Sequence, residues 1–277
     1  MRLLVTIVLG VLGVLPGAGG APTQSSVRFA VIGDSGTGDR VQYEVARQMV
    51  AARTRMPFEL VIMLGDNIYG HQGPDDFVQK FERPYKPLLD AGVRFYAALG
   101  NHDNEHNRFY GPFNMGGERY YTYTVKNVRF FVLDSDYLDP KQRTWIENAL
   151  RNAGDDWKIC YFHHPLYSDG GRHGSQVDLR VVLEPMFVKY DVNVVFSGHD
   201  HIYERLKPQN GVHYFVAGAA GQLRKGDVRP SEMTAAAFAQ DQSFVLVDIT
   251  GDDMKFEAIS RAGQIVDSGV IHREARP

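Results

Sequence analysis

Short apolar runs alternate along the chain with polar, glycine-containing turns. Residues 27–32, 60–64 and 93–99 are near-continuous apolar runs, and a helix-type spacing of apolar residues after Asp39 separates the first two. Strands that are buried on both faces read as continuous apolar runs, because neither face meets water. The order strand, helix, strand therefore predicts parallel βαβ units, with Asp39 as the N-cap of the helix.

The middle of the chain is rich in aromatic and β-branched residues. Residues 120–125 (YYTYTV) and 128–134 (VRFFVLD) flank the dipeptide Lys126-Asn127, which suits a tight turn. Two such runs joined by two turn residues predict a β-hairpin.

Helical and extended patterns then alternate towards the C-terminus. They predict a helix from Pro140 to about Gly154, a strand at 158–162, a helix at 179–190 and a strand at 192–196. Proline has no N–H to donate, so we expect Pro185 to break or restart the second helix. From about Tyr214 onward the pattern predicts antiparallel strands at 214–218, 243–249, 254–260 and 264–271.

The first 21 residues differ from the rest of the chain. Arg2 precedes an apolar run at 3–15, and small residues follow Pro16 up to Ala21. A positive start, a short apolar stretch and small residues predict a signal peptide over 1–21, and so a secreted or periplasmic protein. An uncleaved N-terminal anchor is the alternative, although the run is short for a transmembrane helix. No composition shift marks a second domain, so we expect one domain over 22–277.

Composition excludes some classes of function. Apolar residues make up 44% and charged residues 23%, with a formal net charge of −3, which is ordinary globular usage. A nucleic-acid binder would carry a basic surface, so we expect no nucleic-acid partner, and no membrane contact beyond the export signal. Cys160 is the single cysteine and lies in an apolar run, which predicts a buried structural residue and excludes an internal disulfide. No pattern indicates an oligomeric state.

Polar residues follow five of the apolar runs. They are Asp34, Asp66, Asn101, His163 and His199. Ligands bind at the carboxyl ends of strands in open α/β sheets, so we expect these side chains to meet at one edge. His201 lies two residues beyond His199, and in an extended segment both side chains point the same way.

This mixture of oxygen and imidazole donors suits zinc, manganese or iron. A carboxylate such as Asp66 can bridge two cations, and two metal ions can clamp a phosphoryl group. Each Gly-Asp pair alone is more typical of a turn or a helix cap. Their joint occurrence at strand ends favours a metal site.

The same segments resemble the motifs of the calcineurin-like metallophosphoesterase superfamily, complete and in order. The motifs are residues 33–36 (GDSG), 65–67 (GDN), 100–103 (GNHD), 163–165 (HHP) and 198–201 (GHDH). Within that superfamily, 65–69 (GDNIY) and 198–205 (GHDHIYER) are similar to motifs of purple acid phosphatases of the tartrate-resistant type. The resemblance implies an α/β fold of four layers, with two central mixed β-sheets flanked by helices.

The resemblance also implies a pair of metal ions. It assigns Fe³⁺ to Asp34, Asp66, Tyr69 and His201, and a divalent ion (Fe²⁺, Zn²⁺ or Mn²⁺) to Asp66, Asn101, His163 and His199. Asp66 would bridge the two ions. His163 is chosen over His164 because the family pattern is His-x-Pro. Tyr69 would bind the ferric ion as phenolate, and the alternative is a rim tyrosine in an enzyme without ferric iron.

Two further histidines are implied as catalytic residues. His102 matches a histidine that contacts phosphate and donates a proton. His173 lies where small purple phosphatases place a second such histidine, and the alternative is a solvent-facing loop residue.

The predicted function is a secreted binuclear metallophosphatase that hydrolyses small phosphate monoesters by attack of a metal-bound hydroxide. A phosphodiesterase or nucleotidase on the same scaffold is the first alternative, because the loops 68–92, 104–119 and 167–177 would set substrate choice. A non-catalytic metal- or phosphate-binding protein is the second. Such a protein would be expected to have lost one or more of the ligands, and all seven are present.

Overall fold

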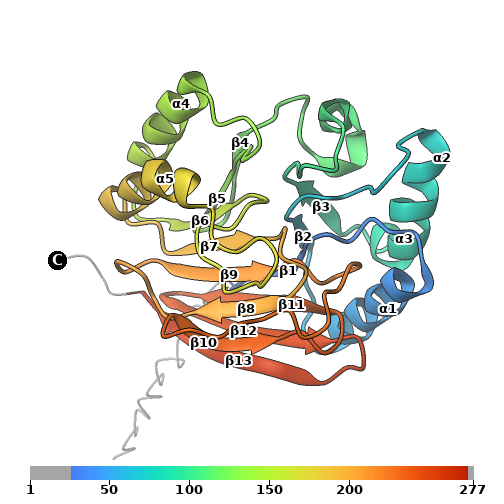
Figure 1. The fold of residues 1–277 in the computed structure, drawn as a ribbon. Helices are drawn as coiled ribbons and strands as arrows, with labels where there is room; N and C mark the ends of the chain where they lie inside the picture. The colour runs from blue at the N-terminus through green and yellow to red at the C-terminus, as the bar shows by residue number, and fades with distance from the viewer. Residues whose placement is uncertain (1–25, 274–277) are drawn as a thin grey trace, which may run out of the picture.

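Two β-sheets pack face to face, with helices on their outer faces (Figure 1). The computed structural model describes residues 26–273, so the predicted signal peptide at 1–21 lies outside the described residues. The first sheet has the order β13 (Ile265–His272), β12 (Asp253–Ser260), β11 (Ser243–Thr250), β1 (Ser26–Ile32), β2 (Leu60–Met63) and β3 (Arg94–Ala97). The second has the order β10 (Thr234–Phe238), β8 (Tyr203–Leu206), β9 (His213–Ala217), β7 (Val194–Ser197), β6 (Trp157–Tyr161), β5 (Val128–Val132) and β4 (Tyr121–Val125).

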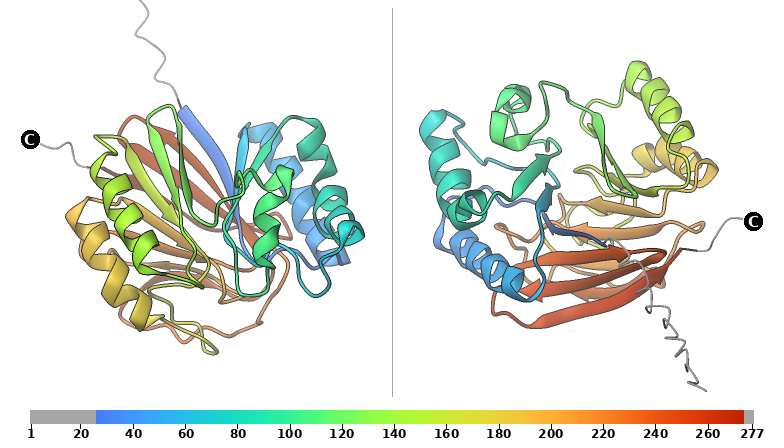
Figure 2. Two further views of the ribbon diagram at one scale, coloured as in Figure 1. Left: turned by 90° about the horizontal axis from the view of Figure 1, so that it is seen from above. Right: turned by 180° about the vertical axis from the view of Figure 1, so that it is seen from behind.

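Helices cover the outer face of each sheet (Figure 2). Helices α1 (Arg40–Arg55), α2 (Pro74–Phe77) and α3 (Arg83–Asp90) lie on the side of the first sheet, and α4 (Pro140–Arg151) and α5 (Val177–Lys189) cover the second. Both sheets are mixed, because β1, β2 and β3 run parallel while β11 is antiparallel to β1, and β5, β6 and β7 run parallel while β4 is antiparallel to β5. The predicted four-layer α/β sandwich is confirmed. Among residues 26–273, no helix combines the length and the apolarity needed to cross a bilayer.

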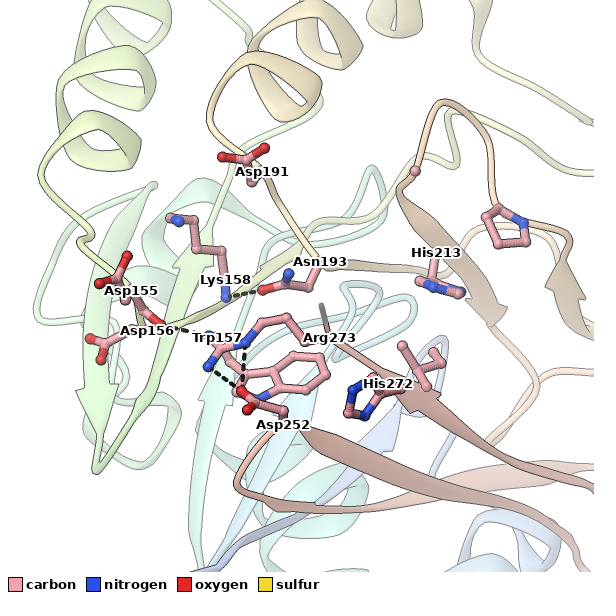
Figure 3. A pocket seen from close by; sticks show the side chains of 13 residues that line it. Asp155, Asp156, Trp157, Lys158, Asp191, Asn193, His213, Asp252, His272 and Arg273 are labelled. Atoms are coloured by element: carbon pink, nitrogen blue, oxygen red, sulfur yellow. Dashed lines mark hydrogen bonds and ion pairs between the residues drawn. The ribbon is translucent and has the colours of Figure 1, made fainter. Parts of the chain in front are cut away.

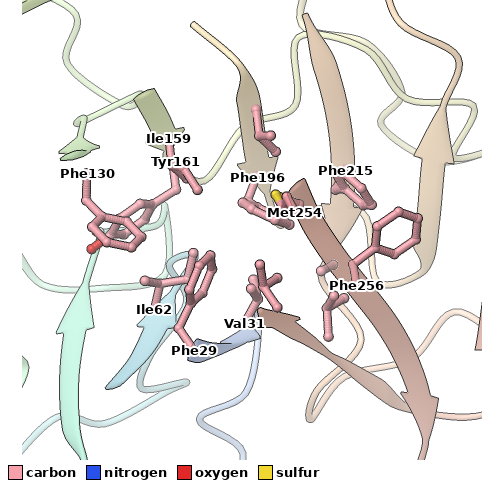
Figure 4. Packing of buried hydrophobic residues seen from close by; sticks show 14 of the residues in the cluster. Phe29, Val31, Ile62, Phe130, Ile159, Tyr161, Phe196, Phe215, Met254 and Phe256 are labelled. Carbon is pink, nitrogen blue, oxygen red and sulfur yellow. The ribbon is translucent and has the colours of Figure 1, made fainter. Parts of the chain in front are cut away.

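The continuous apolar runs have a structural cause in β1. Phe29 and Val31 point into the core between the sheets (Figure 4), and Ala30 and Ile32 pack under the helices of the first sheet. Alternate residues of a strand face opposite sides, so a central strand in a four-layer sandwich buries every side chain.

Several local predictions are confirmed. Asp39 caps α1, since its Oδ1 accepts hydrogen bonds from the N–H groups of Val41 and Gln42 at 3.0 and 3.1 Å. The hairpin joins β4 to β5, with Lys126 in the left-handed region at a φ of 53°. Cys160 is buried in β6.

Other local predictions are wrong. Residues 68–92, expected to be a loop, contain α2, a π-helical turn (Val78–Glu82) and α3. Pro74 at the first helical position and two following aspartates were the start signal that pattern reading missed. The helix at 179–190 does not break at Pro185: α5 runs through it. Pro185 and Val181, whose carbonyl loses its helical donor, are both exposed, so water can replace that hydrogen bond.

The predicted antiparallel strands at 243–249, 254–260 and 264–271 are confirmed as β11, β12 and β13, whereas the strand before them differs in part. The predicted strand at 214–218 corresponds to β9, which pairs parallel to β7, although it pairs antiparallel to β8 as expected. Strands β8 and β10 were not predicted. They pair with each other at the end of the second sheet, and β10 has a half-exposed burial pattern and an irregular register that give it a weak sequence signal.

Phe29→Ala should destabilise the protein by about 3–5 kcal/mol, because it removes a large side chain from a close-packed core. The Phe29 ring is fully buried and lies edge-on to Phe130 and Phe196, with centroids 5.3 and 6.3 Å away. Urea unfolding measures the change. Val270→Ala, at a side chain that is 58% exposed, is the control and should stay within about 0.5 kcal/mol. Equal effects for the two variants would contradict this assignment of the core.

Candidate metal centre

The predicted site residues come from both sheets and meet at one edge. Asp34, Asp66 and Asn101 follow β1, β2 and β3 of the first sheet, and His163 and His199 follow β6 and β7 of the second. Backbone hydrogen bonds hold neighbouring loops together: Asp34 N–H donates to the Gly65 carbonyl at 3.1 Å, and Gly198 N–H to the His163 carbonyl at 2.9 Å. The predicted residues therefore meet at one edge as expected, but the strands that precede them belong to two sheets.

Three of these residues have left-handed backbone conformations. The φ angles are 54° at Asp34, 51° at Asp66 and 67° at His199. Non-glycine residues adopt this region at a cost, and such strain clusters at functional sites. Backbone N–H groups also bind the two carboxylates: His199 N donates to Asp34 Oδ2 and His102 N to Asp66 Oδ1, both at 2.9 Å. The first of these bonds joins the two sheets.

One group of ligand atoms gathers around Asp34. Asp34, Asp66 and His201 each offer an atom within 4.8 Å of the others. The Tyr69 hydroxyl donates to Asp34 Oδ1 at 3.2 Å and lies 3.3 Å from His201 Nε2. The structure therefore brings together the four side chains that sequence reasoning assigned to Fe³⁺.

A second group gathers around His163. Its Nε2 lies 3.0 Å from Asn101 Oδ1, 3.1 Å from His199 Nδ1 and 3.5 Å from Asp66 Oδ1. Its Nδ1 lies 3.0 Å from the Leu64 carbonyl, so Nδ1 carries the proton and Nε2 presents a lone pair to the site. Asp66 thus lies between the groups, as a bridging carboxylate would.

His164 also lies at this second group. It offers a nitrogen within 4.8 Å of those of His163 and His199, although sequence reasoning gave it only the variable place in the His-x-Pro pattern. Its Nδ1 is 2.9 Å from Ser135 Oγ. The paired histidines were the available signal, and only the fold shows that both rings approach His199.

The electrostatics of the protein residues fit bound cations. Burial, followed by neighbouring histidines, lowers the pKa of His163 and His199, to about 2 for His199. Neutral imidazoles are the form that binds metals. Burial and repulsion from Asp66 raise the pKa of Asp34, and burial and both carboxylates raise that of Tyr69. Buried acidic groups facing neutral imidazoles favour a positive charge between them.

The two predicted catalytic histidines each contact a different predicted ligand. The His102 ring is 5.0 Å from the Tyr69 ring, and its backbone is tied to Asp66. The His173 ring is 4.2 Å from that of His199. Both side chains are exposed, so both can reach a ligand at the edge.

Asp103 is a supporting residue that sequence reasoning left without a role. Its carboxylate accepts hydrogen bonds from the N–H groups of Asn67, Ile68 and Gly100, at 2.9 to 3.1 Å. It therefore joins the loop after β2 to the loop after β3, and fixes the spacing of Asp66 and Asn101.

A cavity also lies elsewhere in the molecule. It measures about 750 Å³ and is lined by residues at the opposite ends of the strands, among them Trp157 at the start of β6 and His213 at the start of β9 (Figure 3). Arg273 and Asp252 form an ion pair of 2.7 Å at its wall. Because it lies at the amino ends of these strands, this cavity is not part of the metal centre.

Comparison with known proteins agrees with this geometry. The sequence profile of the calcineurin-like phosphoesterases matches residues 27–203, which include every predicted ligand. The chain belongs to the calcineurin-like phosphoesterase family. The resemblance noted in the sequence is thereby confirmed, as is the class of phosphoric ester hydrolase, and this family implies a dinuclear metal centre.

Individual relatives and solved structures are also similar to this chain. Tartrate-resistant acid phosphatase type 5 of Oryctolagus cuniculus is 29% identical over 250 residues, which cover 74% of this chain and 75% of that protein. Purple acid phosphatase PPD1 of Lupinus luteus superposes with a TM-score of 0.74 at 20% identity, over 91% of this chain and 54% of that one. GAP50 of Plasmodium, described as an anchor in the inner membrane complex, has a TM-score of 0.77 at 18% identity, over 91% and 90% of the chains. The structures show a shared fold, and a fold alone does not decide activity.

Gly100→Ala should lower metal content and thermal stability together. A Cβ at Gly100 would lie 2.4 Å from Asp66 Oδ1 and 2.9 Å from His163 Nδ1, so both side chains would have to move. Overpacking of this kind costs about 1–3 kcal/mol. Metal per chain by mass spectrometry and the Tm test this. Gly111→Ala is the matched control, because a Cβ added at Gly111 would have no atom within 4 Å apart from its chain neighbours. Full metal content in Gly100→Ala would contradict the arrangement.

Proposed function

We propose that this protein is a secreted binuclear metallophosphatase of the purple acid phosphatase type that hydrolyses small phosphate monoesters. The position of Tyr69 carries the proposal. Its hydroxyl lies at hydrogen-bond distance from Asp34 and His201, within the group of acidic and imidazole ligand atoms. A tyrosine that only filled space would not need its oxygen in that group.

The residues divide into two ligand sets. Asp34, Asp66, Tyr69 and His201 would hold Fe³⁺, and Asp66, Asn101, His163 and His199 would hold Fe²⁺, Zn²⁺ or Mn²⁺. When bound, such a pair supplies Lewis-acid stabilisation of phosphoryl oxygens and lowers the pKa of water. The hard oxygen ligands and the phenol suit the trivalent ion, and the imidazole-rich group suits a divalent one.

The two exposed histidines would bind the ester and protonate its leaving group. His102, held by its backbone bond to Asp66, donates a proton from its imidazole to the leaving oxygen. His173, over the His199 ring, also binds the ester. Similarity to tartrate-resistant acid phosphatase type 5 supports the monoester reaction, and the export signal expected at 1–21 supports secretion.

Asp66→Asn should remove bound metal and reduce turnover of p-nitrophenyl phosphate by at least about 10²–10³-fold, because Asp66 contacts both ligand groups. Metal analysis and initial rates on monoester and diester substrates measure the two effects. Asp90→Asn, at an exposed carboxylate on α3, is the control. A fully active Asp66→Asn enzyme would refute the metal centre. A diester preference in the wild type would favour the phosphodiesterase alternative, and metal binding without hydrolysis would favour a binding protein.

Tyr69→Phe should abolish a visible charge-transfer band in the iron-loaded protein, because the phenolate oxygen that would bind ferric iron is removed. An absorption spectrum of protein with measured iron content is the test. Tyr43→Phe on α1, whose hydroxyl donates a hydrogen bond to the Gln79 carbonyl at 3.4 Å, should keep the band. A colourless, active, iron-loaded wild type would reject the phenolate assignment and leave the phosphoesterase assignment intact.

A further inference from the structure

Two loops border the metal centre beside His199 and His201. The first, residues 168–174, is fixed by Asp200, whose Oδ2 accepts hydrogen bonds from Ser168 Oγ at 2.6 Å and from Gly174 N at 3.1 Å. Asp200 is buried between the two predicted ligands, so this loop is held directly to their segment.

The second loop follows β9 and is held to the ligand segments by its backbone. Ala220 N donates to the Gly33 carbonyl at 3.1 Å, Gln222 N to the Asp34 carbonyl at 3.0 Å, and Arg224 N to the His201 carbonyl at 3.0 Å. The main chain of Arg224 is thus one hydrogen bond from the main chain of a predicted ligand. Because this loop is anchored to the rigid strand ends, the position of Arg224 is preorganised.

The Arg224 side chain reaches across to the first loop. Its Nη2 is 3.4 Å from His173 Nε2, and the His173 ring is 4.2 Å from that of His199. His173 thus contacts both the guanidinium and the ring of His199, and Arg224 lies beside the predicted metal ligands.

The guanidinium has unused binding capacity. Among residues 26–273 it has no carboxylate partner, and its buried Nε has no hydrogen-bond acceptor. A buried donor without an acceptor is unfavourable, and more so on a charged group. Arg172, which precedes His173 on the first loop and is exposed, adds a second positive charge next to that histidine in the chain. An anion at this rim would satisfy both features.

We propose that Arg224 binds a second anionic group of the substrate, beside the phosphoryl group that is cleaved. The inference rests on the proposed phosphatase function and narrows its substrate class to phosphomonoesters whose leaving group carries a phosphate or a carboxylate. A guanidinium pairs with either group through two parallel N–H donors. Its place beside His173 at the border of the site suits a part of the substrate that extends away from the metals.

Three aryl phosphates test this on one scaffold: phenyl phosphate, 4-carboxyphenyl phosphate and 1,4-phenylene bisphosphate. For Arg224→Gln, the ratio of kcat/KM on each charged ester to kcat/KM on phenyl phosphate should fall about 10- to 100-fold, mainly through KM. In Arg224→Lys, which keeps the positive charge, this ratio should fall less than in Arg224→Gln. The two charged esters show whether carboxylate or phosphate is the preferred second group.

Lys225→Gln is the matched control, because it removes the same charge from an exposed neighbouring side chain. Its ratios should equal those of the wild type. Binding gives a second readout. In calorimetry, Arg224→Gln should weaken the binding of 4-phosphonobenzoate more than that of phenylphosphonate, and the ratio of the two losses should again be about 10- to 100-fold. The Tm and metal content confirm that each variant is folded and loaded.

Three results would overturn the inference. Equal losses on all three esters would mean that Arg224 acts on the transferred phosphoryl group or on the structure. No change on any ester would mean that it does not contact the substrate, and equal losses for Lys225→Gln would reduce the effect to general surface charge. Failure of the wild type to hydrolyse any of the esters would instead refute the proposed function.

Discussion

The face-to-face packing of the two sheets is the constraint on which the site depends. Phe29 of the first sheet contacts Phe130 and Phe196 of the second across this interface. Such a core sets the distance and the angle between the sheets, because interdigitated side chains leave little freedom to slide. A shift of one sheet would separate the oxygen donors of one from the imidazoles of the other.

Polar contacts then convert this packing into ligand geometry. His199 N–H donates across the sheets to Asp34, and the Leu64 carbonyl orients the His163 ring. Each contact fixes a ligand through its other atoms, so the atoms that face the centre are positioned before any ion binds. The left-handed backbone at Asp34, Asp66 and His199 adds strain, which the surrounding hydrogen bonds and core hold in place.

The residues at the border of the site are held differently from the predicted metal ligands at its centre. The predicted ligands lie on segments that leave strands directly, whereas His173 and Arg224 lie on longer loops that are pinned to those segments by Asp200 and by backbone bonds. Specificity in enzymes usually resides in loops on a rigid scaffold. This division agrees with a site in which residues at the strand ends hold the metals and residues on the loops select the substrate.

The sequence alone determined the local elements and the residue types of the site. Continuous apolar runs identified β1, β2 and β6, Asp39 identified the start of α1, and the polar residue after each strand identified the candidate ligands. These signals are local, since propensity, capping and periodicity act within a few residues.

The tertiary structure decided how the two sheets share these residues and which further residues join them. The assignment of β3 and β6 to different sheets, the approach of His164 to His199 and the contact of Arg224 with His173 join segments far apart in the chain. Sequence reasoning missed β8, β10 and the parallel pairing of β9 with β7 for the same reason. Long-range contacts depend on how whole sheets and loops pack, and no short stretch of residues encodes that packing.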